Sequence, residues 1–327
     1  MKLRIAFQMD PIENIDIDAD STFRIAEEAQ NRGHRLFYFL PRDLSFVEDK
    51  LLCEGHELSV KRKIGDHFLL GPKVTLNLIE DVDILWLRQD PPFDMSYITT
   101  TYLLDYVRNS TLVVNNPFWV RNYPEKIVVL RYPELIPPTV IGKNLEIFQS
   151  FKKEHGDVIV KPLYGNGGAG VFRIGNNDPN LNSLIELFQN FSKEPIIMQK
   201  YLPEVQYGDK RVILIDGSPI GAINRIPGQG EIRSNMHVGG KAVKTKLTAR
   251  DLEICRKIGP LMKEKDQVLV GLDIIGDKLT EINLTSPTGI QELERFDNIN
   301  IAQKIWDCLE KKYNLKFGEI KTNLFLN

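Results

Sequence analysis

The chain of 327 residues is too long for one ordinary hydrophobic core, so its length predicts two or three lobes. A formal net charge of −2, with acidic and basic residues mixed, gives no reason to expect a nucleic acid or an anionic membrane as partner. The 3 cysteines are scattered without metal-ligand spacing, and no apolar run approaches membrane length, which together predict a soluble cytoplasmic protein.

The first part of the chain alternates between strand and helix patterns. Residues 21–32 have helical periodicity, and Gly33 directly after them predicts the end of that helix. A second helix-like stretch covers residues 98–109. Apolar and β-branched residues typical of strands fill four runs: 3–9, 34–40, 82–88 and 111–116. We therefore expect an open α/β, Rossmann-like lobe over residues 1–122.

The stretch NNPFWVRNYPEK, residues 115–126, is rich in proline and asparagine and predicts a domain boundary. A central lobe is expected over residues 123–200. Its predicted elements are a short helix carrying Lys126, a strand at 137–142, a helix at 145–156, a glycine-rich hairpin, a helix at 180–191 and a strand at 195–202.

A third lobe is expected over residues 201–316, followed by a tail, 317–327, without a usable motif. Its predicted elements are a hairpin over 211–225 closed by Asp216 and Gly217, a long helix at 248–265, and paired strands at 268–275 and 278–284.

The glycine-rich segment is KPLYGNGGAGVFRI, residues 161–174. Apolar strand-like runs flank it on both sides, so the loop joins two strands, whereas a Walker loop or dinucleotide fingerprint leads from a strand into a helix. A glycine-rich hairpin can still close over phosphate oxygens with its backbone N–H groups. The alternative is a mobile surface hairpin, and Lys161 at the end of the incoming strand favours the phosphate flap.

The strongest chemical signal lies in the last strand pair. Glu281 and Asn283 are two residues apart on one strand and therefore share a face. A three-residue turn over 276–278 would place Asp273 opposite Glu281, whereas a two-residue turn would pair Leu272 with Glu281 instead. Three such oxygen ligands suit a hard divalent cation such as Mg²⁺. The alternative is the polar face of an exposed hairpin.

Basic residues occur where a polyphosphate would need them: Lys126 after the boundary, Lys161 before the flap, and Arg211 and Arg225 in one hairpin. Each alone is typical of a solvated surface charge. Together with the flap and the metal trio they indicate a nucleotide–metal site of the kind that serves phosphoryl transfer.

The stretch IPGQGEIRSNMHVGG, residues 226–240, is long, contains glycines and lacks periodicity. Such loops are usually functional lids or disordered segments. A lid would protect a reactive intermediate from water, and Arg233 and the pair Gly239–Gly240 are its candidate residues.

An ordered set of motifs follows along the chain: Lys126, Lys161 with its glycine hairpin, QKYLPE, GDKRV, RIPGQGEIRSNMHVGG and GLDIIGDKLTEINLTSP. This set resembles the ATP-grasp fold, specifically the prokaryotic-type glutathione synthetases. MDPIENI and RQDPPFD resemble the substrate-side lobe of that family, so the likeness extends from the first strand to about residue 310. The fold expected is therefore α/β, with α+β lobes.

The resemblance implies an ATP-dependent ligase that joins γ-glutamylcysteine to glycine through an acyl phosphate. It implies ATP and one or two Mg²⁺ ions, with Mn²⁺ as a possible substitute, and a homo-oligomer, either a tetramer or a dimer.

The resemblance also implies roles for individual residues. Lys126 and Lys161 would hold phosphates, with the flap residues Gly165, Asn166, Gly167, Gly168 and Gly170 above them. Adenine would lie against the linker residues Gln199, Lys200, Tyr201 and Leu202, and the ribose near Asp209 and Lys210. The metal ligands would be Asp273, Glu281 and Asn283, and the charge-neutralising arginines Arg211, Arg225 and Arg233. The dipeptide or the product would contact Arg88, Gly240 and Ser286.

The chain departs from the pattern at Gln199, where many ATP-grasp enzymes have glutamate, so its adenine contacts stay open. Two rival functions are also open. Another ATP-grasp ligase, acting on D-amino acids or a protein tail, would share the nucleotide site and differ in the N-terminal lobe. A nucleotide-binding regulatory module would keep the ATP site and have lost the chemistry, and the intact metal trio and both arginines argue against it.

Overall fold

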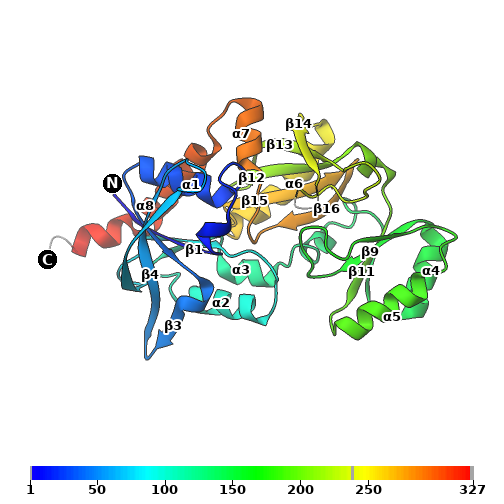
Figure 1. The fold of residues 1–327 in the computed structure, drawn as a ribbon, viewed down its shortest axis with the longest axis horizontal. Coiled ribbons are helices and arrows are strands. Elements are labelled where there is room, and N and C mark those ends of the chain that lie inside the picture. Colours follow the sequence, from blue (N-terminus) through cyan, green and yellow to red (C-terminus); the bar gives the residue numbers. More distant parts are fainter. Residues whose placement is uncertain (1, 237–238, 325–327) are drawn as a thin grey trace.

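The computed structural model describes residues 2–236 and 239–324. In this part of the chain three sheets, one in each of three lobes, organise the molecule (Figure 1). The order of the lobes along the chain is the order expected from the sequence.

The N-terminal lobe contains the parallel sheet that the strand and helix patterns predict. Its parallel strands are β1 (Arg4–Met9), β2 (Arg35–Phe39), β6 (Ile84–Arg88) and β7 (Leu112–Val114), in the order β2-β1-β6-β7. Its helices are α1 (Ser21–Asn31), α2 (Met95–Tyr106) and α3 (Pro117–Asn122). Alternation along β1 sends Phe7 to the core beneath α1 and Ala6 to the core beneath α2, so both faces of the sheet are covered.

Three antiparallel strands extend this sheet where the sequence analysis assigned no element. They are β3 (Leu44–Val47), β4 (Lys50–Val60) and β5 (Phe68–Asn77). Gly55 interrupts the alternating pattern of β4, because a Cβ there would lie 2.7 Å from the carbonyl oxygen of Tyr38 on β2. The glycine that weakens the strand signal is therefore the residue that lets β4 approach β2.

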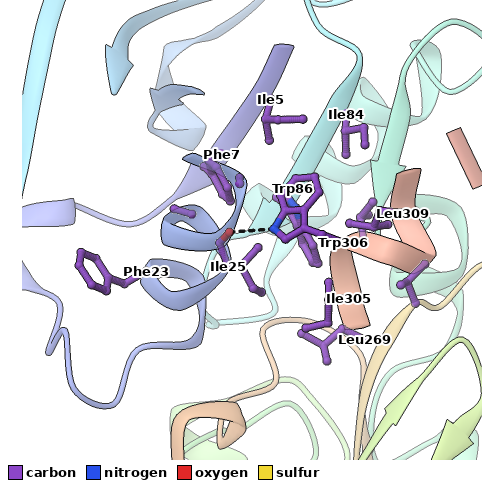
Figure 2. Close-up of a cluster of buried hydrophobic side chains, with 14 of the residues drawn as sticks. Ile5, Phe7, Phe23, Ile25, Ile84, Trp86, Leu269, Ile305, Trp306 and Leu309 are labelled. Atoms are coloured by element: carbon purple, nitrogen blue, oxygen red, sulfur yellow. Dashed lines mark hydrogen bonds between the residues drawn. The ribbon is translucent and has the colours of Figure 1, made fainter. Parts of the chain in front are cut away.

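The C-terminal helix completes the core of the N-terminal lobe. Helix α8 (Ile301–Leu324) lies beside this lobe, at the left of Figure 1, and contacts α1. Figure 2 shows Trp306 of α8 beside Trp86 of β6, with the indole Nε1 donating to the carbonyl of Ile25 at 2.9 Å. The boundary expected at residue 317 falls inside this helix, which continues through Gly318. Residues 325–327 of the expected tail lie outside the described residues.

The central lobe is a four-stranded antiparallel sheet with two helices on one face. Its strands follow the order β10 (Phe172–Ile174), β9 (Val158–Pro162), β11 (Ile196–Lys200) and β8 (Thr139–Gly142), and its helices are α4 (Leu145–His155) and α5 (Leu181–Phe191). Phe148 of α4 and Ile185 of α5 pack against Val160 and Met198 of the sheet. The pairing of Val160 with Phe172 confirms the hairpin around the glycines.

The third lobe contains a five-stranded antiparallel sheet. Its strands follow the order β14 (Lys241–Lys244), β13 (Ser218–Ile226), β12 (Asp209–Ile215), β15 (Leu269–Ile275) and β16 (Lys278–Asn283). Helix α6 (Ala249–Glu264) covers one face, where Leu272 and Ile282 are buried. Helix α7 (Ile290–Asp297) precedes α8. The opposite face of β15 and β16 carries the predicted metal ligands.

Four short 3₁₀ helices complete the described elements: η1 (Ile12–Asn14), η2 (Pro41–Asp43), η3 (Val128–Arg131) and η4 (Pro203–Tyr207). The helix expected to carry Lys126 is η3, which begins two residues later, so Lys126 lies in the preceding turn. Two amides, of Ile127 and Val128, donate to the carbonyl of Pro124 and form that turn. Within residues 2–236 and 239–324, no helix has the length and apolarity needed to cross a membrane.

Candidate active site

A cleft of about 120 Å³ lies between the central lobe and the sheet of the third lobe. Five segments line it: the flap (165–170), the linker (199–202), the lid (226–240), the strand β9 and the hairpin β15–β16. Of the lid, His237 and Val238 lie outside the described residues. The predicted site residues that line this cleft are Lys126, Lys161, Gly165, Asn166, Gly167, Gly168, Gln199, Tyr201, Leu202, Asp209, Arg233, Asp273 and Glu281.

Two lysines meet one carboxylate at the wall of the cleft. Lys161 Nζ donates to Glu281 Oε1 at 3.2 Å, and Lys126 Nζ lies 3.6 Å from the same oxygen. Lys126 also donates to the carbonyl of Gly165 at the base of the flap. Burial by itself raises the pKa of Glu281, but the two lysines outweigh burial and lower the pKa, so this carboxyl is charged. Two predicted phosphate ligands and one predicted metal ligand thus meet.

A second charge cluster lies beside Glu281. Arg211 on β12 pairs directly with Asp273 on β15, and its Nε and Nη2 each donate to one carboxylate oxygen at 2.7 Å. Arg225 Nη2 lies 3.0 Å from Asp273 Oδ2 and 2.5 Å from Asp209 Oδ2. The bidentate contact fixes the Arg211 fork on the cleft side of the sheet. Both predicted arginines therefore reach the cleft through carboxylates that line it.

The two carboxylates of this cluster differ in acidity. Burial by itself raises the pKa of Asp273, but Arg211 and Arg225 outweigh burial and lower it. Burial raises the pKa of Asp209 to about 6, and the charge of Asp273 adds to this rise against the opposing effect of Arg225. Asp273 is therefore the permanently charged member, which suits a predicted metal ligand.

The pairing of Asp273 with Glu281 is confirmed, but the expected turn is wrong. Ile275 pairs with Lys278, so the turn contains two residues, Gly276 and Asp277. Gly276 has φ +62°, as the first central residue of a type II′ turn requires. A β-bulge between Asp273 and Ile274 then leaves Thr280 as an extra residue. The bulge shifts the register by one and restores the pairing that a two-residue turn alone would abolish.

The donor set of this hairpin fits a hard divalent ion. Asp273 and Glu281 face each other, and Asn283 lies two residues beyond Glu281 on the same face, with its amide Nδ2 donating to the carbonyl of Gly271 at 3.3 Å. Carboxylate and amide oxygens are the ligands that Mg²⁺ prefers. Within the described part of the chain, no group of three or more histidine, cysteine, aspartate or glutamate side chains is arranged for a metal, so the candidate site depends on the amide as its third ligand.

The flap and the lid touch each other over the cleft. Arg233 of the lid donates from Nη1 to the carbonyl of Gly168 at 3.4 Å, and a Cβ at Gly168 would lie 2.9 Å from Asn235 Oδ1. Gly168 also has φ +83°, so both the close approach and the conformation require glycine. Ser234 Oγ donates to Asp209 Oδ2 at 3.0 Å, which ties the lid to the arginine cluster.

Two other predicted glycines are structural neighbours of these segments. Gly170 packs against Pro162 at the base of the flap, where a Cβ would lie 2.9 Å from the proline Cγ. Gly240 packs against Ser234, and its amide donates to the carbonyl of Asn235 at 3.1 Å. Among the described residues that line the cleft, neither Gly170 nor Gly240 occurs. The structure therefore does not bring these two glycines to the position that the predicted ligand contacts need.

The linker forms the deep end of the cleft. Gln199 is buried, and its Nε2 donates to Thr139 Oγ1 at 3.1 Å. The Arg173 guanidinium stacks over the Tyr201 ring at 4.1 Å, and Tyr201 donates its amide to the carbonyl of Asp157. These contacts hold the aromatic wall of the linker in one orientation.

Three further predicted residues, Lys210, Arg88 and Ser286, also lie outside the cleft. Lys210 pairs with Asp251, the buried capping residue of α6, because strand alternation sends it to the face opposite Arg211. Arg88 and Ser286 lie together, since Ser286 Oγ donates to the carbonyl of Arg88 at 3.1 Å. Arg88 is buried and donates to Thr22 Oγ1 at 2.9 Å and to the carbonyl of Pro287 at 3.2 Å. They mark the end of β6, at the carboxyl edge of the parallel sheet, where open α/β sheets bind ligands.

Several cleft residues were missed by the sequence analysis. Ile159 lies two residues before Lys161 on β9, so strand alternation alone could have identified it. Val171, Val205 and Ile275 also line the cleft and add apolar surface to it. Ser234 and Asn235 had no signal, because their contacts depend on where the lid lies over the flap.

Comparison with known proteins agrees with this geometry. The family model of the prokaryotic glutathione synthetase N-terminal domain matches residues 3–121. The model of the prokaryotic glutathione synthetase ATP-grasp domain matches residues 125–298. The two models divide the chain between residues 121 and 125.

Whole-chain comparisons give the same result. The chain is 52% identical over 312 residues to the glutathione synthetase of Brucella melitensis biotype 1, covering 95% of this chain and 100% of that protein. It is 53% identical over 312 residues to the glutathione synthetase of Mesorhizobium japonicum, covering 95% and 99%.

Solved structures show the same fold at low sequence identity. The D-cycloserine synthetase DcsG has a TM-score of 0.66 at 14% identity, covering 95% of this chain and 99% of that one. The ATP-grasp ligase PsnB complexed with minimal precursor has a TM-score of 0.61 at 18% identity, covering 95% and 99%. The chain therefore belongs to the prokaryotic glutathione synthetase family and is an ATP-dependent peptide ligase with the ATP-grasp fold.

Proposed function

We propose that this protein joins γ-glutamylcysteine to glycine, with hydrolysis of ATP to ADP and phosphate. The observation that supports this most directly is the meeting of Lys126, Lys161 and Glu281 beneath the glycine flap, in a chain whose relatives are glutathione synthetases along almost their whole length. The same relatives argue against a ligase for D-amino acids or protein tails.

The cleft suits ATP in one orientation. The apolar end formed by Ile159, Leu202 and Val205 would take the adenine ring, and the wall formed by Lys126 and Lys161 would take the α and β phosphates. Glycines of the flap would donate backbone N–H groups to the phosphate oxygens from above. Asp209 would lie near the ribose, as the family resemblance implies.

Asp273, Glu281 and Asn283 would hold one or two divalent ions, for which we propose Mg²⁺, with Mn²⁺ as a substitute. A bound ion would supply positive charge to the phosphate oxygens. Glu281 already contacts both lysines, so it would adjust its partners when the phosphates and the ion arrive.

The reaction would proceed through positioned charges. The carboxylate at the cysteine end of the dipeptide attacks the γ-phosphorus, and ADP leaves. The glycine amine then attacks the acyl carbon, phosphate leaves, and the amide forms. Arg211 and Arg225, held by Asp273 and Asp209, would compensate charge at the transferring phosphoryl group. Arg233 and its lid would exclude water from the acyl phosphate.

The charged glutamyl end of the dipeptide would bind near Arg88 and Ser286, with Gly240 of the lid closing over it. Burial lowers the pKa of Arg88, and the charges of Asp20 and Asp90 oppose this effect. A carboxylate bound there would compensate a buried guanidinium that is costly to desolvate alone.

Further expectations concern the setting of the enzyme. A homo-oligomer, either a tetramer or a dimer, and a cytoplasmic location stay predictions. The same holds for the expectation that neither nucleic acid nor membrane is a partner.

Phosphate release tests the proposal. Purified protein with ATP and Mg²⁺ should release phosphate only when γ-glutamylcysteine is present, and glycine should convert the dipeptide stoichiometrically into the tripeptide. Turnover with D-alanine or a protein tail, and none with γ-glutamylcysteine, would make the substrate assignment wrong.

A further inference from the structure

A second, smaller cavity adjoins the phosphate end of the cleft. This side pocket, which has about 20 Å³ of space for a small group, shares Lys126, Gly165 and Asn166 with the cleft. Its lining also includes Thr285, which directly precedes Ser286. The side pocket therefore adjoins the reacting end of the nucleotide site and contains a neighbour of the region that would bind the charged end of the dipeptide.

The walls of the side pocket are largely apolar. They are formed by Pro91, Phe93, Val120, Pro124, Leu163 and Tyr164. Phe93 comes from the N-terminal lobe and Tyr164 from the residue before the flap, and their rings stack with centroids 6.0 Å apart and an interplanar angle of 28°. Burial raises the pKa of Tyr164, so the phenol stays neutral. Two lobes thus contribute one uncharged aromatic wall.

The charged residues of the side pocket are already engaged. Glu125 Oε1 accepts from Thr285 Oγ1 at 2.8 Å and from the Leu284 and Thr285 amides. Lys126, the basic side chain among the described lining residues, contacts the carbonyl of Gly165 and Glu281. A zwitterion such as glycine would find no carboxylate partner there, and burying its charge unpaired would be costly.

Covalent connectivity then limits what can enter. In γ-glutamylcysteine the side chain CH₂SH branches from the carbon that bears the reacting carboxylate. When that carboxylate lies at the γ-phosphate, the thiol must lie beside the phosphate end of the cleft. The thiol is also the small uncharged part of the substrates, and sulfur packs favourably against aromatic rings.

We propose that the side pocket binds the cysteinyl side chain of the dipeptide and that Phe93 and Tyr164 determine selectivity for it. This inference rests on the proposed function. Tyr164 is the residue directly before the flap. Binding of the cysteinyl side chain in the side pocket and closure of the flap over the phosphates therefore involve adjacent residues. Nothing in this assignment requires Tyr164 to touch the nucleotide.

Dipeptide analogues test the assignment through ratios of kcat/KM. The panel is γ-glutamylcysteine, γ-glutamyl-2-aminobutyrate, in which a methyl replaces the thiol, γ-glutamylalanine and γ-glutamylleucine. The wild type should accept the first two and discriminate against the others by roughly 10-fold or more, as expected for one or two carbon atoms in an apolar pocket. Tyr164→Ala should lower kcat/KM for γ-glutamylcysteine about 10-fold and raise it for γ-glutamylleucine.

The controls separate selectivity from general damage. Phe191→Ala removes an exposed aromatic ring on α5 of the same lobe and should leave every ratio unchanged. Tyr164→Phe keeps the ring and should keep the wild-type ratios. Phe93→Leu provides a second wall variant if Tyr164→Ala proves unstable, and it should also relax the discrimination against γ-glutamylleucine.

Two outcomes would contradict the proposals, and they can be distinguished from each other. Wall variants that retain the wild-type leucine-to-cysteine ratio, or that raise only the KM for ATP, would overturn the pocket assignment while leaving the ligase function intact. A wild-type enzyme that fails to use γ-glutamylcysteine at all would instead overturn the proposed function itself.

Discussion

Glu281 is the residue at which the charges of the site meet. Its carboxylate contacts Lys126 and Lys161 and lies across the hairpin from Asp273. In the free protein it neutralises lysines that would otherwise repel each other beside the cleft. On the proposed function, a polyphosphate would neutralise the lysines instead, and the carboxylate would then be released to hold a cation.

Glu281→Gln should therefore reduce kcat on the order of 10²-fold, in line with removal of one charged stabilising group from an active site. Because the amide keeps the shape of the side chain, the melting temperature should change far less than turnover. Titration with Mg²⁺ under steady-state conditions measures the effect, and the variant should need more Mg²⁺ for half-maximal rate.

Glu57→Gln is the matched control, since this exposed glutamate pairs with Arg35 on the N-terminal sheet. It should leave turnover unchanged. Near-normal turnover of Glu281→Gln at low Mg²⁺ would show that this carboxylate is not a metal ligand.

Among the elements, the hairpin β15–β16 shows how a local irregularity controls chemistry. Its two-residue turn would place Glu281 opposite Leu272, and the bulge at Thr280 returns Glu281 to Asp273. Thr280 Oγ1 donates to the carbonyl of Asp273 at 3.1 Å, which fixes the bulge on its partner strand. The accommodation of Thr280 in a bulge, rather than in the regular ladder, thus decides on which face the Glu281 carboxylate lies.

Deletion of Thr280 removes the bulge and should leave Glu281 opposite Asp273, because the two-residue turn then pairs these residues directly, so turnover should fall far less than in Glu281→Gln. Thr280→Ala keeps the extra residue and should cost only about 1 kcal/mol for one hydrogen bond. Phosphate release and thermal unfolding measured on both variants check this. A deletion variant without measurable turnover would contradict this register.

The lid offers a second test at this scale. Arg233 is partly exposed and contacts the flap through one long hydrogen bond, so trypsin should cleave after it in the free protein. A non-hydrolysable ATP analogue with γ-glutamylcysteine should suppress this cut. Arg233→Gln should remove the fragment and so identifies the site. A cut that ligands leave unaffected would argue against a closing lid.

These elements also show what sequence alone can predict. Strand alternation and helical periodicity identified β12, β13, α6 and the face of the metal trio correctly, because one buried face dominates each pattern. The strands over 44–77 were missed, since Gly55 and polar residues dilute their alternation. The bulge and the Phe93–Tyr164 contact were inaccessible, because both depend on how separate segments pack.

At the scale of the whole molecule, the cleft lies where two lobes meet. The core of the N-terminal lobe is completed by α8, the last helix of the chain. His34 of the N-terminal lobe makes this dependence measurable. Its Nδ1 accepts from the amide of Leu3 at 3.3 Å, so Nε2 carries the proton that faces Glu310 Oε1 of α8 at 3.0 Å. Burial lowers the pKa of His34 and the charge of Arg32 adds to this, against the opposing effect of Glu310.

The folded state therefore binds fewer protons at His34 than the unfolded state does, and the free energy of unfolding should fall as pH drops below about 6.5, the value of a free histidine. In His34→Asn, whose amide oxygen can replace Nδ1 as acceptor, the curve should be flatter over the same range. Urea unfolding at several pH values measures the two slopes. Equal slopes would show that His34 is not the group responsible.

The position of α8 has a consequence for the order in which the protein is made. The apolar surface of β1, β6 and α1 that Trp306 covers leaves the ribosome early, whereas α8 follows every other element in the chain. At typical synthesis rates, the roughly 200 residues between the end of the N-terminal lobe and residue 317 take about 10 to 40 s. During that time the nascent lobe presents an uncovered hydrophobic face to chaperones, so the lobe that is synthesised first is the last to close.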